Sequence, residues 1–379
     1  MLVLPDRSFL RRERKLLTRL EVGLADEGVR VLHAVPHGWT EDGESLGVYS
    51  TPIGFSDSGL PWTEGLRAGV LIRSILGVAP PGPDERVFDL VHAFGEQGWP
   101  LAAELAARTG TVLVLEAWRP ACGRALVRAM GRMKSSGGSE RTVVIAADDR
   151  LVQPLARLAP GATIVPAPWG VHLPESVNPA PRAGQTRTAV LLASGAQPSA
   201  VHAALAGLAA LAAPGPQPAI DLMVFVDAEC ALRCGLWKVA RTLEMQHRLS
   251  IIAELEGKRE LVLQADALVL PETLGEQRTL VLDAMAHGMP VIAAPDPVVS
   301  AIVPATTCAT VARPTADAWA SVLRPVLGHQ PEAPFAASAR QWIGANRLAS
   351  AQVAAVLKVY QSWGRRFTSR NGLGAGAAS

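Results

Sequence analysis

Short apolar runs alternate with amphipathic stretches along nearly the whole sequence, and this alternation restricts the fold more than any other feature. Helical periodicity occupies Glu13 to Glu27, Gln97 to Thr109 and Asp149 to Leu158 in the first half. The apolar runs there are Leu2 to Pro5, Val29 to Pro36, Asp89 to Phe94, Thr111 to Trp118, Thr142 to Ala147 and Thr163 to Ala167. Parallel strands covered by crossover helices produce this pattern. The sequence therefore predicts an α/β fold.

The alternation restarts after Pro174 to Arg187, a stretch with three prolines and no apolar periodicity that is typical of a linker. Strands are expected at Thr188 to Ala193, Asp221 to Val226, Leu249 to Ala253, Ala267 to Leu270 and Pro290 to Ala293. Helices are expected at Ser199 to Ala212, Ala231 to Met245, Lys258 to Gln264, Glu276 to His287, Thr315 to Leu327 and Pro334 to Trp363. The pattern predicts two doubly wound, Rossmann-like domains that face a cleft.

The domain boundaries follow from these patterns. We expect an N-terminal domain at 1–173, a linker at 174–187 and a C-terminal domain at 188–345. A helix at 346–367 could cross back to the N-terminal domain, and the small polar residues of 368–379 indicate a disordered tail. In open α/β sheets ligands bind outside the carboxyl ends of the strands, so function is expected where strand ends of both domains meet.

Charge and hydropathy exclude several classes of protein. With 36 Lys and Arg against 34 Asp and Glu, the net charge of +2 disfavours a nucleic-acid binder driven by bulk charge. The longest near-apolar run, Val201 to Ala213, is too short to span a bilayer. At the N-terminus an apolar run precedes the basic cluster, the reverse of a secretory signal, so a cytoplasmic protein is expected.

The four cysteines do not suggest a disulfide framework in a chain of 379 residues, and no CxxC pair is present. We expect reduced, buried thiols and no bound metal. Cys230 and Cys234 are spaced i,i+4 on an expected helix, so a metal-binding pair on one helix face is the alternative.

Leu268 to Ala294 contains a buried strand, a polar loop, a helix and a second strand. The loop carries Glu272 and Glu276, and Asp283 lies on the helix. A helix N-terminus offers free backbone N–H groups and partial positive charge, so a diphosphate could dock there while a carboxylate binds ligand hydroxyls. Alternatively, Glu276 stabilises its own helix as a first-turn residue and Asp283 is a solvated charge.

The segment Asp283-Ala284-Met285-Ala286-His287-Gly288-Met289-Pro290-Val291 resembles the signature helix of the family-four, or group one, glycosyltransferases of GT-B fold. Weaker similarities occur in the same order as in that family. They are Glu13 to Pro36, Asp89 to His92, Ile164 to Val171, Thr310 to Pro314 before the Thr315 to Leu327 helix, and Trp342 to Trp363. The resemblance covers nearly the whole chain.

The resemblance implies a C-terminal domain that holds a nucleotide-sugar donor and an N-terminal domain that takes a hydroxyl acceptor. It implies transfer with retention, without a metal or another cofactor. Glu276 or Glu272 would contact the donor sugar, and Asp283 would bind the nucleotide ribose. Gly195, Gly275 and Thr279 are the further donor-site positions that it implies.

The sequence departs from the family at the donor site. Gly275 stands at the place of the first acidic residue, one position before Glu276. The Arg and Lys that clamp the donor diphosphate are missing from Ser194 to Ala200. Positive groups there would stabilise charge on the leaving diphosphate, so Arg278 is the candidate substitute cation.

The acceptor side departs too. Arg11 and Arg12 replace a Gly-Gly pair in the expected first loop, which would suit an anionic acceptor such as a phosphorylated or lipid-linked sugar. The family's histidine would fall near Glu116, a candidate acceptor-binding residue, but no histidine lies there. His92 is then the candidate catalytic histidine, and its alternative is a packed core residue.

Phe9 to Leu24 combines five basic residues with an apolar stripe at i,i+4 spacing. Such a helix could contact the inner face of a membrane, or it could pack its stripe on the sheet. The hypothesis from the sequence is a glycosyltransferase acting in glycan, polysaccharide or glycolipid assembly. The alternative is a glycosyltransferase-like binding or partner protein without catalysis. An epimerase or phosphorylase of the same fold would need site groups that the sequence does not offer.

Overall fold

The computed structural model describes residues 1–39, 52–56, 63–78, 87–135, 137–177, 186–214, 218–328 and 333–371. The chain forms two compact units. The N-terminal unit comprises Met1–Trp169 and the chain from Ala349 onward, and the C-terminal unit comprises Gly170–Leu348. Each unit is built on a parallel sheet with helices between the strands. The predicted α/β class, with two Rossmann-like units, is therefore confirmed.

In the N-terminal unit, the described strands form one sheet in the order β3-β2-β1-β4-β5-β6-β7. Its strands are β1 (Leu2–Pro5), β2 (Leu32–Pro36), β3 (Ile53–Phe55), β4 (Leu90–Phe94), β5 (Val112–Ala117), β6 (Thr142–Ala146) and β7 (Ile164–Pro166). Leu2 lies opposite Leu32 on one side and Val91 on the other. The order of the strands along the chain therefore reverses at β1, which makes the edge beside β1 and β4 the switch point of this sheet.

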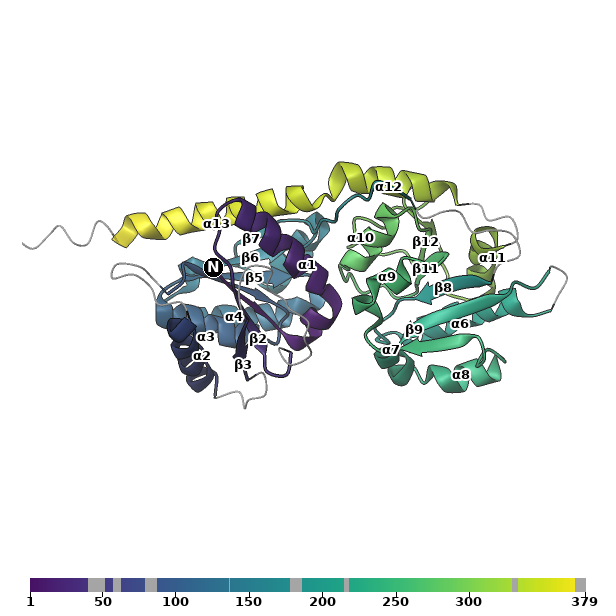
Figure 1. Cartoon of the computed structure of the whole chain (residues 1–379), viewed down its shortest axis with the longest axis horizontal. Helices are drawn as coiled ribbons and strands as arrows, with labels where there is room; N and C mark the ends of the chain where they lie inside the picture. Colours follow the sequence, from purple (N-terminus) through teal and green to yellow (C-terminus); the bar gives the residue numbers. More distant parts are fainter. Residues whose placement is uncertain are drawn as a thin grey trace, which may run out of the picture. The chain divides into compact units, whose positions relative to one another are not determined.

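Two groups of helices cover this sheet. They are α1 (Arg7–Asp26), α2 (Glu64–Val78), α3 (Trp99–Thr109), α4 (Gly123–Ser135), α5 (Val152–Leu158) and the terminal helix α13 (Ala349–Asn371). α1 packs against α13, whereas α3 packs against both α2 and α4. Figure 1 shows α13 on one side of the sheet and α2 and α3 on the other. The terminal helix is thus part of the N-terminal unit.

The first helix starts earlier than expected. The Asp6 side chain accepts a hydrogen bond of 2.8 Å from the Phe9 backbone N–H and caps α1, which begins at Arg7. Arg11 and Arg12 therefore lie within this helix, and their expected place in a loop was wrong. The apolar stripe of α1 is buried, at Phe9, Leu10, Leu16, Leu17, Leu20 and Leu24. These side chains belong to the core of the unit.

In the C-terminal unit, the described strands form a sheet in the order β10-β9-β8-β11-β12-β13. They are β8 (Arg187–Leu191), β9 (Leu222–Asp227), β10 (Leu249–Ile252), β11 (Ala267–Leu270), β12 (Val291–Ala293) and β13 (Ala309–Thr310). The helices are α6 (Pro198–Ala212), α7 (Ala228–Arg233), α8 (Leu236–Thr242), α9 (Arg259–Val262), α10 (Thr279–Ala286), α11 (Ala316–Leu327) and α12 (Pro334–Asn346). The switch point of this sheet lies between β8 and β11.

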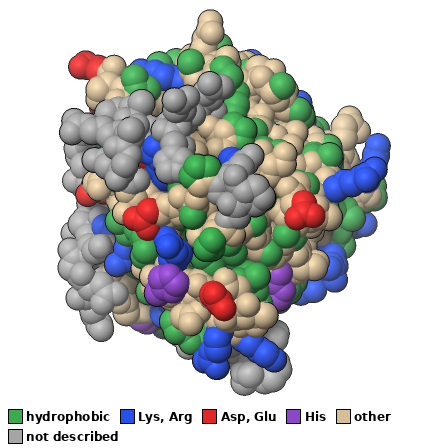
Figure 2. Space-filling view, turned by 90° about the vertical axis from the view of Figure 1, so that its right-hand side faces the viewer, with side chains coloured by type: hydrophobic (Ala, Val, Ile, Leu, Met, Phe, Trp, Pro, Cys, Tyr) green, Lys and Arg blue, Asp and Glu red, His purple; other side chains and the backbone are tan. Residues whose placement is uncertain are grey.

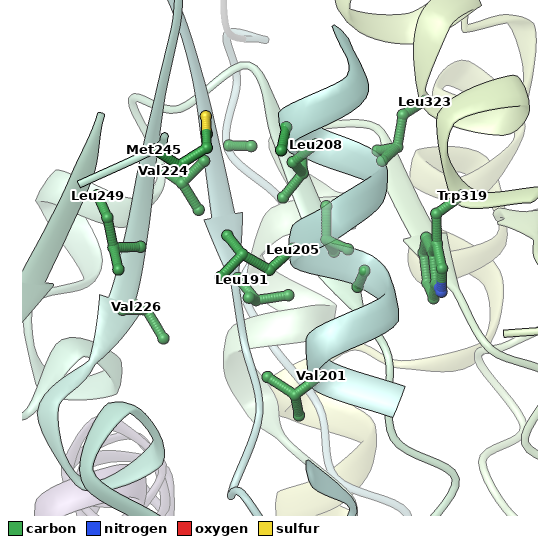
Figure 3. Packing of buried hydrophobic residues seen from close by; sticks show 14 of the residues in the cluster. Leu191, Val201, Leu205, Leu208, Val224, Val226, Met245, Leu249, Trp319 and Leu323 are labelled. Atoms are coloured by element: carbon green, nitrogen blue, oxygen red, sulfur yellow. The ribbon is translucent and has the colours of Figure 1, made fainter. Parts of the chain in front are cut away.

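The core of the C-terminal unit centres on α6. Figure 3 shows Val201, Leu205 and Leu208 of α6 between the sheet and α11. Leu191 approaches from β8, and Trp319 and Leu323 from α11. The Trp319 side chain is fully buried, and burying a side chain of this size contributes about 2–3 kcal/mol. This packing fixes the position of β8 and of the loop that follows it.

One expected helix is interrupted, and one expected helical stretch consists of two helices. The stretch Ala231 to Met245 forms α7 and α8 because Gly235 adopts a left-handed φ of 59° between them. The stretch Pro334 to Trp363 likewise divides into α12 and α13, with Arg347 in a non-helical conformation at the end of α12. The single helix expected at Ala231 to Met245 was therefore wrong, whereas the helical stretch expected at Pro334 to Trp363, with a terminal helix at 346–367, is confirmed by α12 and α13.

Part of the expected linker, residues 178–185, lies outside the described residues. α13 continues to Asn371, and the remainder of the tail expected to be disordered, residues 372–379, also lies outside them. None of the helices in the described ranges combines the length and apolar character that a bilayer-spanning segment needs. Basic, acidic and apolar side chains are interspersed on the face of the protein shown in Figure 2.

Candidate functional site

Glu272 joins the two loops at the switch point of the C-terminal sheet. It lies after β11, and its Oε2 accepts hydrogen bonds from the Ser194 backbone N–H at 2.6 Å and the Ser194 hydroxyl at 2.9 Å. Its Oε1 accepts a bond of 2.7 Å from the Gln197 backbone N–H. Both loop N–H groups lie just before α6, where the helix dipole favours a negative charge. The carboxylate of the protein itself thus occupies this anion-binding position.

Further bonds hold the same two loops together. The Gln197 side chain donates to the Thr273 carbonyl at 3.2 Å and accepts from the Thr273 N–H at 3.0 Å. Gly195 has a φ of +77°, and a Cβ added there would come within 2.9 Å of the Arg233 side chain. A larger residue at position 195 would therefore strain the backbone and clash with α7.

A pocket of about 560 Å³, open mouth included, lies beside this bridge at the carboxyl ends of β11 and β12. Its polar lining consists of Glu272, Glu276, Gln277, Arg278 and Asp296. The remainder is aliphatic: Leu192, Leu270, Leu274, Val281, Leu282, Ala293, Ala294, Val299, Ala301 and Ile302. An apolar pocket with a few convergent polar groups, next to a switch point, is the usual form of a small-molecule site.

Arg278 is the basic residue of the pocket lining, and it lies between two carboxylates. Its guanidinium contacts Glu256 at 2.6 Å and Glu276 at 2.7 Å. The three side chains are at most 8% exposed. Burial lowers the pKa of Arg278, but the two carboxylates outweigh burial and hold the pKa above its ordinary value. Arg278 therefore stays charged and is held in one position.

α10 starts at Thr279, with Arg278 as its N-cap residue, so the expected helix start at Glu276 was wrong. Glu276 lies in the preceding loop and is fixed by its bond to Arg278. Gly275 has a φ of +66°, and its N–H donates to Asp296 at 2.7 Å. The structure therefore brings Glu276, Arg278 and Gly275 to one pocket edge.

Asp283 is paired within the protein. Its carboxylate contacts the guanidinium of Arg259, which comes from α9 and also donates to the Thr279 hydroxyl at 2.5 Å. Arg259 is 2% exposed and Asp283 is 6% exposed. A buried, paired carboxylate must exchange partners before it can accept hydrogen bonds from a ligand. Ribose binding by Asp283 stays a prediction.

The acceptor-side candidates lie in the N-terminal unit, and two of them share a buried network. The Nε2 atom of His92 lies 3.0 Å from Glu116, which also accepts a bond of 2.5 Å from the Trp169 indole. The Nδ1 atom of His92 lies 2.6 Å from the Tyr360 hydroxyl. Burial, and then the Glu116 charge, raise the pKa of Tyr360 well above its ordinary value. The tyrosine stays protonated and can donate to His92.

His92 is fully buried and Glu116 is 1% exposed. Both nitrogens of the His92 ring have partners, so the network ties β4 and β5 to α13. The catalytic role of His92 and the acceptor role of Glu116 stay predictions. Arg11 is exposed, and the Arg12 guanidinium lies 5.4 Å from the Trp118 ring.

The site also contains residues that the sequence analysis did not identify. Glu256 and Arg259 reach the pocket edge from the segment before β11 and pair with Arg278 and Asp283. Asp296 reaches it from the segment after β12. In the sequence each of these three residues is visibly charged, but no motif of fixed spacing connects any of them with the residue that it contacts.

The cysteines are buried, free thiols, as expected. Burial raises the pKa of Cys230, and burial also raises the pKa of Cys234, so both stay protonated. In the described part of the chain, no group of three or more His, Cys, Asp or Glu is arranged to hold a metal ion.

Comparison with known proteins defines the fold. No protein-family model and no curated protein matches the sequence. Among solved structures, the chain is similar to the sucrose-phosphate synthase of Thermosynechococcus elongatus, with a TM-score of 0.68, 12% identity and coverage of 95% of this chain and 98% of the other. It is similar to Anabaena Alr3699/HepE in complex with UDP and glucose, with a TM-score of 0.69, 12% identity and coverage of 95% and 99%.

A third structure is WaaG, a glycosyltransferase involved in lipopolysaccharide biosynthesis. The TM-score is 0.60 at 15% identity, with coverage of 94% of this chain and 99% of WaaG. All three similarities extend over essentially the full length of both chains. The chain therefore has the fold of GT-B glycosyltransferases, the class that the sequence resemblance implied, with a donor-site motif that departs from the usual one.

Proposed function

We propose that the protein is a glycosyltransferase that moves a sugar from a nucleotide-sugar donor to a hydroxyl acceptor. The observation that carries this proposal is the pocket beside the switch point of the C-terminal sheet, with Arg278 fixed in its lining. Ligands of open α/β sheets bind at this place. The full-length similarity to a structure that contains UDP and glucose supports the same donor class.

In this proposal Arg278 and Glu276 have separate tasks. The transferred sugar leaves a nucleoside diphosphate behind, and a cation that is already in place stabilises the developing negative charge. Arg278 would supply that charge in place of a metal ion. Glu276 would accept hydrogen bonds from sugar hydroxyls, and the aliphatic walls would exclude water. We further propose that transfer proceeds with retention, on the basis of the family resemblance.

The acceptor side is proposed from the same resemblance. Arg11, Arg12, Glu116 and His92 are the residues we assign to it, for a saccharide, a lipid-linked sugar or another hydroxyl compound. We assign the protein to the cytoplasm and to glycan, polysaccharide or glycolipid assembly.

A second candidate is a binding or partner protein of the same fold that lacks catalysis. The charges of the pocket favour it. Glu256 and Glu276 already neutralise Arg278, and Glu272 already accepts the N–H groups before α6. A diphosphate entering here would compete with these carboxylates for its hydrogen-bond donors.

Turnover of nucleotide sugars separates the two candidates. The wild-type protein should release nucleoside diphosphate in the presence of a hydroxyl acceptor. Glu276→Gln and Arg278→Ala should each lower the rate by on the order of 100-fold, the usual effect of removing one preorganised charge or hydrogen bond. Arg241→Ala, on the exposed side of α8, is the matched control and should keep the wild-type rate. Equal rates in all four proteins would remove this pocket from the mechanism.

A further inference from the structure

One face of the N-terminal unit combines exposed aliphatic side chains with an excess of positive charge. α2, α3 and α4 pack side by side and form one layer over the sheet. Within α2, Leu66 is 76% exposed and Val70 is 54% exposed. These two residues are spaced i,i+4, so they lie next to each other on the helix surface. The stripe at Glu64, Ala68, Leu71 and Ile75 is buried instead.

α4 supplies most of the charge. Arg124, Arg128, Arg132 and Lys134 are all exposed, and Val127, which is 50% exposed, lies among them. The buried stripe of α4 is Gly123, Leu126, Ala129 and Met133, so the basic residues are on the outer side of the helix. We call the outer surface of these three helices the α2–α4 face.

The charge of the α2–α4 face is unbalanced. The three helices contain seven Arg and Lys residues but two acidic residues. Glu104 pairs with Arg108 of the same helix at 2.8 Å, and Glu64 pairs with Arg132 at 3.4 Å. The remaining five cations exceed the net charge of +2 of the whole chain. These three helices therefore carry a clear excess of positive charge.

The helix α1 is also basic, but it differs from the α2–α4 face in its apolar side chains. Its apolar stripe is buried in the unit, so it presents a basic face without exposed aliphatic side chains of that stripe. The α2–α4 face presents both. Leu and Val side chains between cations suit a surface with an anionic layer above an apolar layer, which is the structure of a phospholipid leaflet. A nucleic acid would use the charge but would leave the aliphatic side chains without a partner.

We propose that the α2–α4 face binds the surface of membranes that contain anionic phospholipids. Arg124, Arg128 and Lys134 bind the headgroups, and Leu66, Val70 and Val127 enter the boundary between headgroups and acyl chains. The interaction is peripheral and depends on salt, because it rests on charge as well as on apolar contact. This inference is independent of the reaction proposed above.

Flotation of the purified full-length protein with vesicles tests this proposal. The protein should bind vesicles of phosphatidylcholine mixed with phosphatidylglycerol, bind weakly to phosphatidylcholine alone and dissociate at high salt. Arg124→Gln combined with Arg128→Gln should lower the partition coefficient roughly 30-fold, since each headgroup-bound Arg contributes about fivefold. Leu66→Ser combined with Val70→Ser should lower it about tenfold without a change in charge.

The matched control is Lys238→Gln combined with Arg241→Gln on α8 of the C-terminal unit. It removes the same charge beside an exposed aromatic residue, Trp237, which is 48% exposed. It should bind vesicles as the wild type does, and circular dichroism should show that all variants are folded. The proposal is overturned if the protein does not bind anionic vesicles, if both α2–α4 variants bind normally, or if the control loses as much binding as they do. Binding to DNA but not to vesicles would overturn it as well.

Discussion

At the switch point of each sheet a buried or partly buried carboxylate accepts hydrogen bonds from backbone N–H groups of the central loops, but the carboxylate lies on a different loop in each unit. In the N-terminal unit Asp6 follows β1 and accepts from the Phe9 N–H of its own helix and the Gln97 N–H after β4, at 2.8 and 3.0 Å. In the C-terminal unit Glu272 follows β11 and accepts from the loop after β8. Each carboxylate thus links the two central loops of its sheet. In the N-terminal unit it comes from the loop after the first strand, β1, and in the C-terminal unit it comes from the loop after β11, not from the loop after the first strand, β8.

The neighbourhoods of the two carboxylates differ more. Beside Asp6 the polar groups form closed networks, such as His92 with Glu116, Trp169 and Tyr360. Beside Glu272 lies an open pocket with a fixed cation, Arg278. The comparison indicates that the same arrangement of loops can either stabilise the fold or form part of a ligand-binding site. We expect substitutions of Asp6 and Tyr360, to which no ligand is assigned, to change stability without changing nucleotide affinity. Substitutions at the C-terminal pocket should change ligand binding too.

The largest stability effect is expected for the buried pair of Asp283 and Arg259. Asp283→Ala leaves a buried guanidinium without its carboxylate, and the free energy of unfolding should fall by about 3–5 kcal/mol. Urea unfolding measures it. Arg259→Met combined with Asp283→Leu removes both charges, so it should cost less than either single change. If Asp283→Ala is neutral, Asp283 and Arg259 do not form a buried ion pair.

Asp6 should give the protein an unusual pH dependence. Burial raises the pKa of Asp6 from 3.8 to about 6, although the two backbone N–H bonds act in the opposite direction. The folded state then binds the proton more tightly than the unfolded state does. The stabilisation by this group is fully present below about pH 4 and is lost as pH rises through 6. The loss is at most about 3 kcal/mol.

Thermal unfolding of the wild type and Asp6→Asn between pH 4.5 and 7.5 isolates this contribution. The variant cannot titrate at position 6, and Asn remains a good helix cap, so its stability should fall less between these two pH values. Parallel pH profiles for the two proteins would show that Asp6 does not have a raised pKa.

Glu272→Gln tests whether the Glu272 carboxylate, like that of Asp6, stabilises the fold through its hydrogen bonds to the loop N–H groups. The amide cannot accept from both the Ser194 and Gln197 N–H groups, because one of its two polar atoms is a donor. Leaving one of these groups unpaired should cost about 1–3 kcal/mol. Calorimetry with inorganic pyrophosphate provides the second readout. Binding should become tighter in the variant, since a competing negative charge is gone, and weaker binding would mean that Glu272 contacts the ligand itself.

The smallest effect is expected for Tyr360→Phe. It leaves the Nδ1 atom of His92 without its partner and should lower the free energy of unfolding by about 1–2 kcal/mol. Nucleotide affinity should not change, because Tyr360 belongs to the N-terminal network. Protease sensitivity of α13 should rise together with this loss of stability. A change in nucleotide affinity would contradict the view that Tyr360 belongs to a network separate from the nucleotide site.

The sequence predicted the fold better than the site, for physical reasons. Buried parallel strands are continuous apolar runs, so the bounds expected for Leu2–Pro5 and Ala267–Leu270 match the structure. Ile53–Phe55 was missed because a strand of three residues with a central glycine has little pattern to detect. The start of α1 was missed because it depends on a single cap, Asp6.

At the site, Glu276, Arg278 and Glu272 were identified from one continuous segment, and the structure brings all three to one pocket. The partners of Arg278 and Asp283 were not predictable in the same way. Glu256 and Arg259 lie more than 20 positions earlier in the chain and meet them only after the sheet has formed. The sequence shows that these residues are charged, but only the fold determines which charges cancel.

The most direct test of the central claim is titration calorimetry of the wild-type protein and Arg278→Ala with UDP, ADP, GDP and their glucose conjugates. We predict that the wild type binds one nucleotide class and that Arg278→Ala loses this binding by more than about tenfold, the value of one charge-assisted hydrogen bond. Circular dichroism should show that the variant is folded. Failure of the wild type to bind any of these nucleotides, or equal affinity in the variant, would contradict a nucleotide-sugar site built around Arg278.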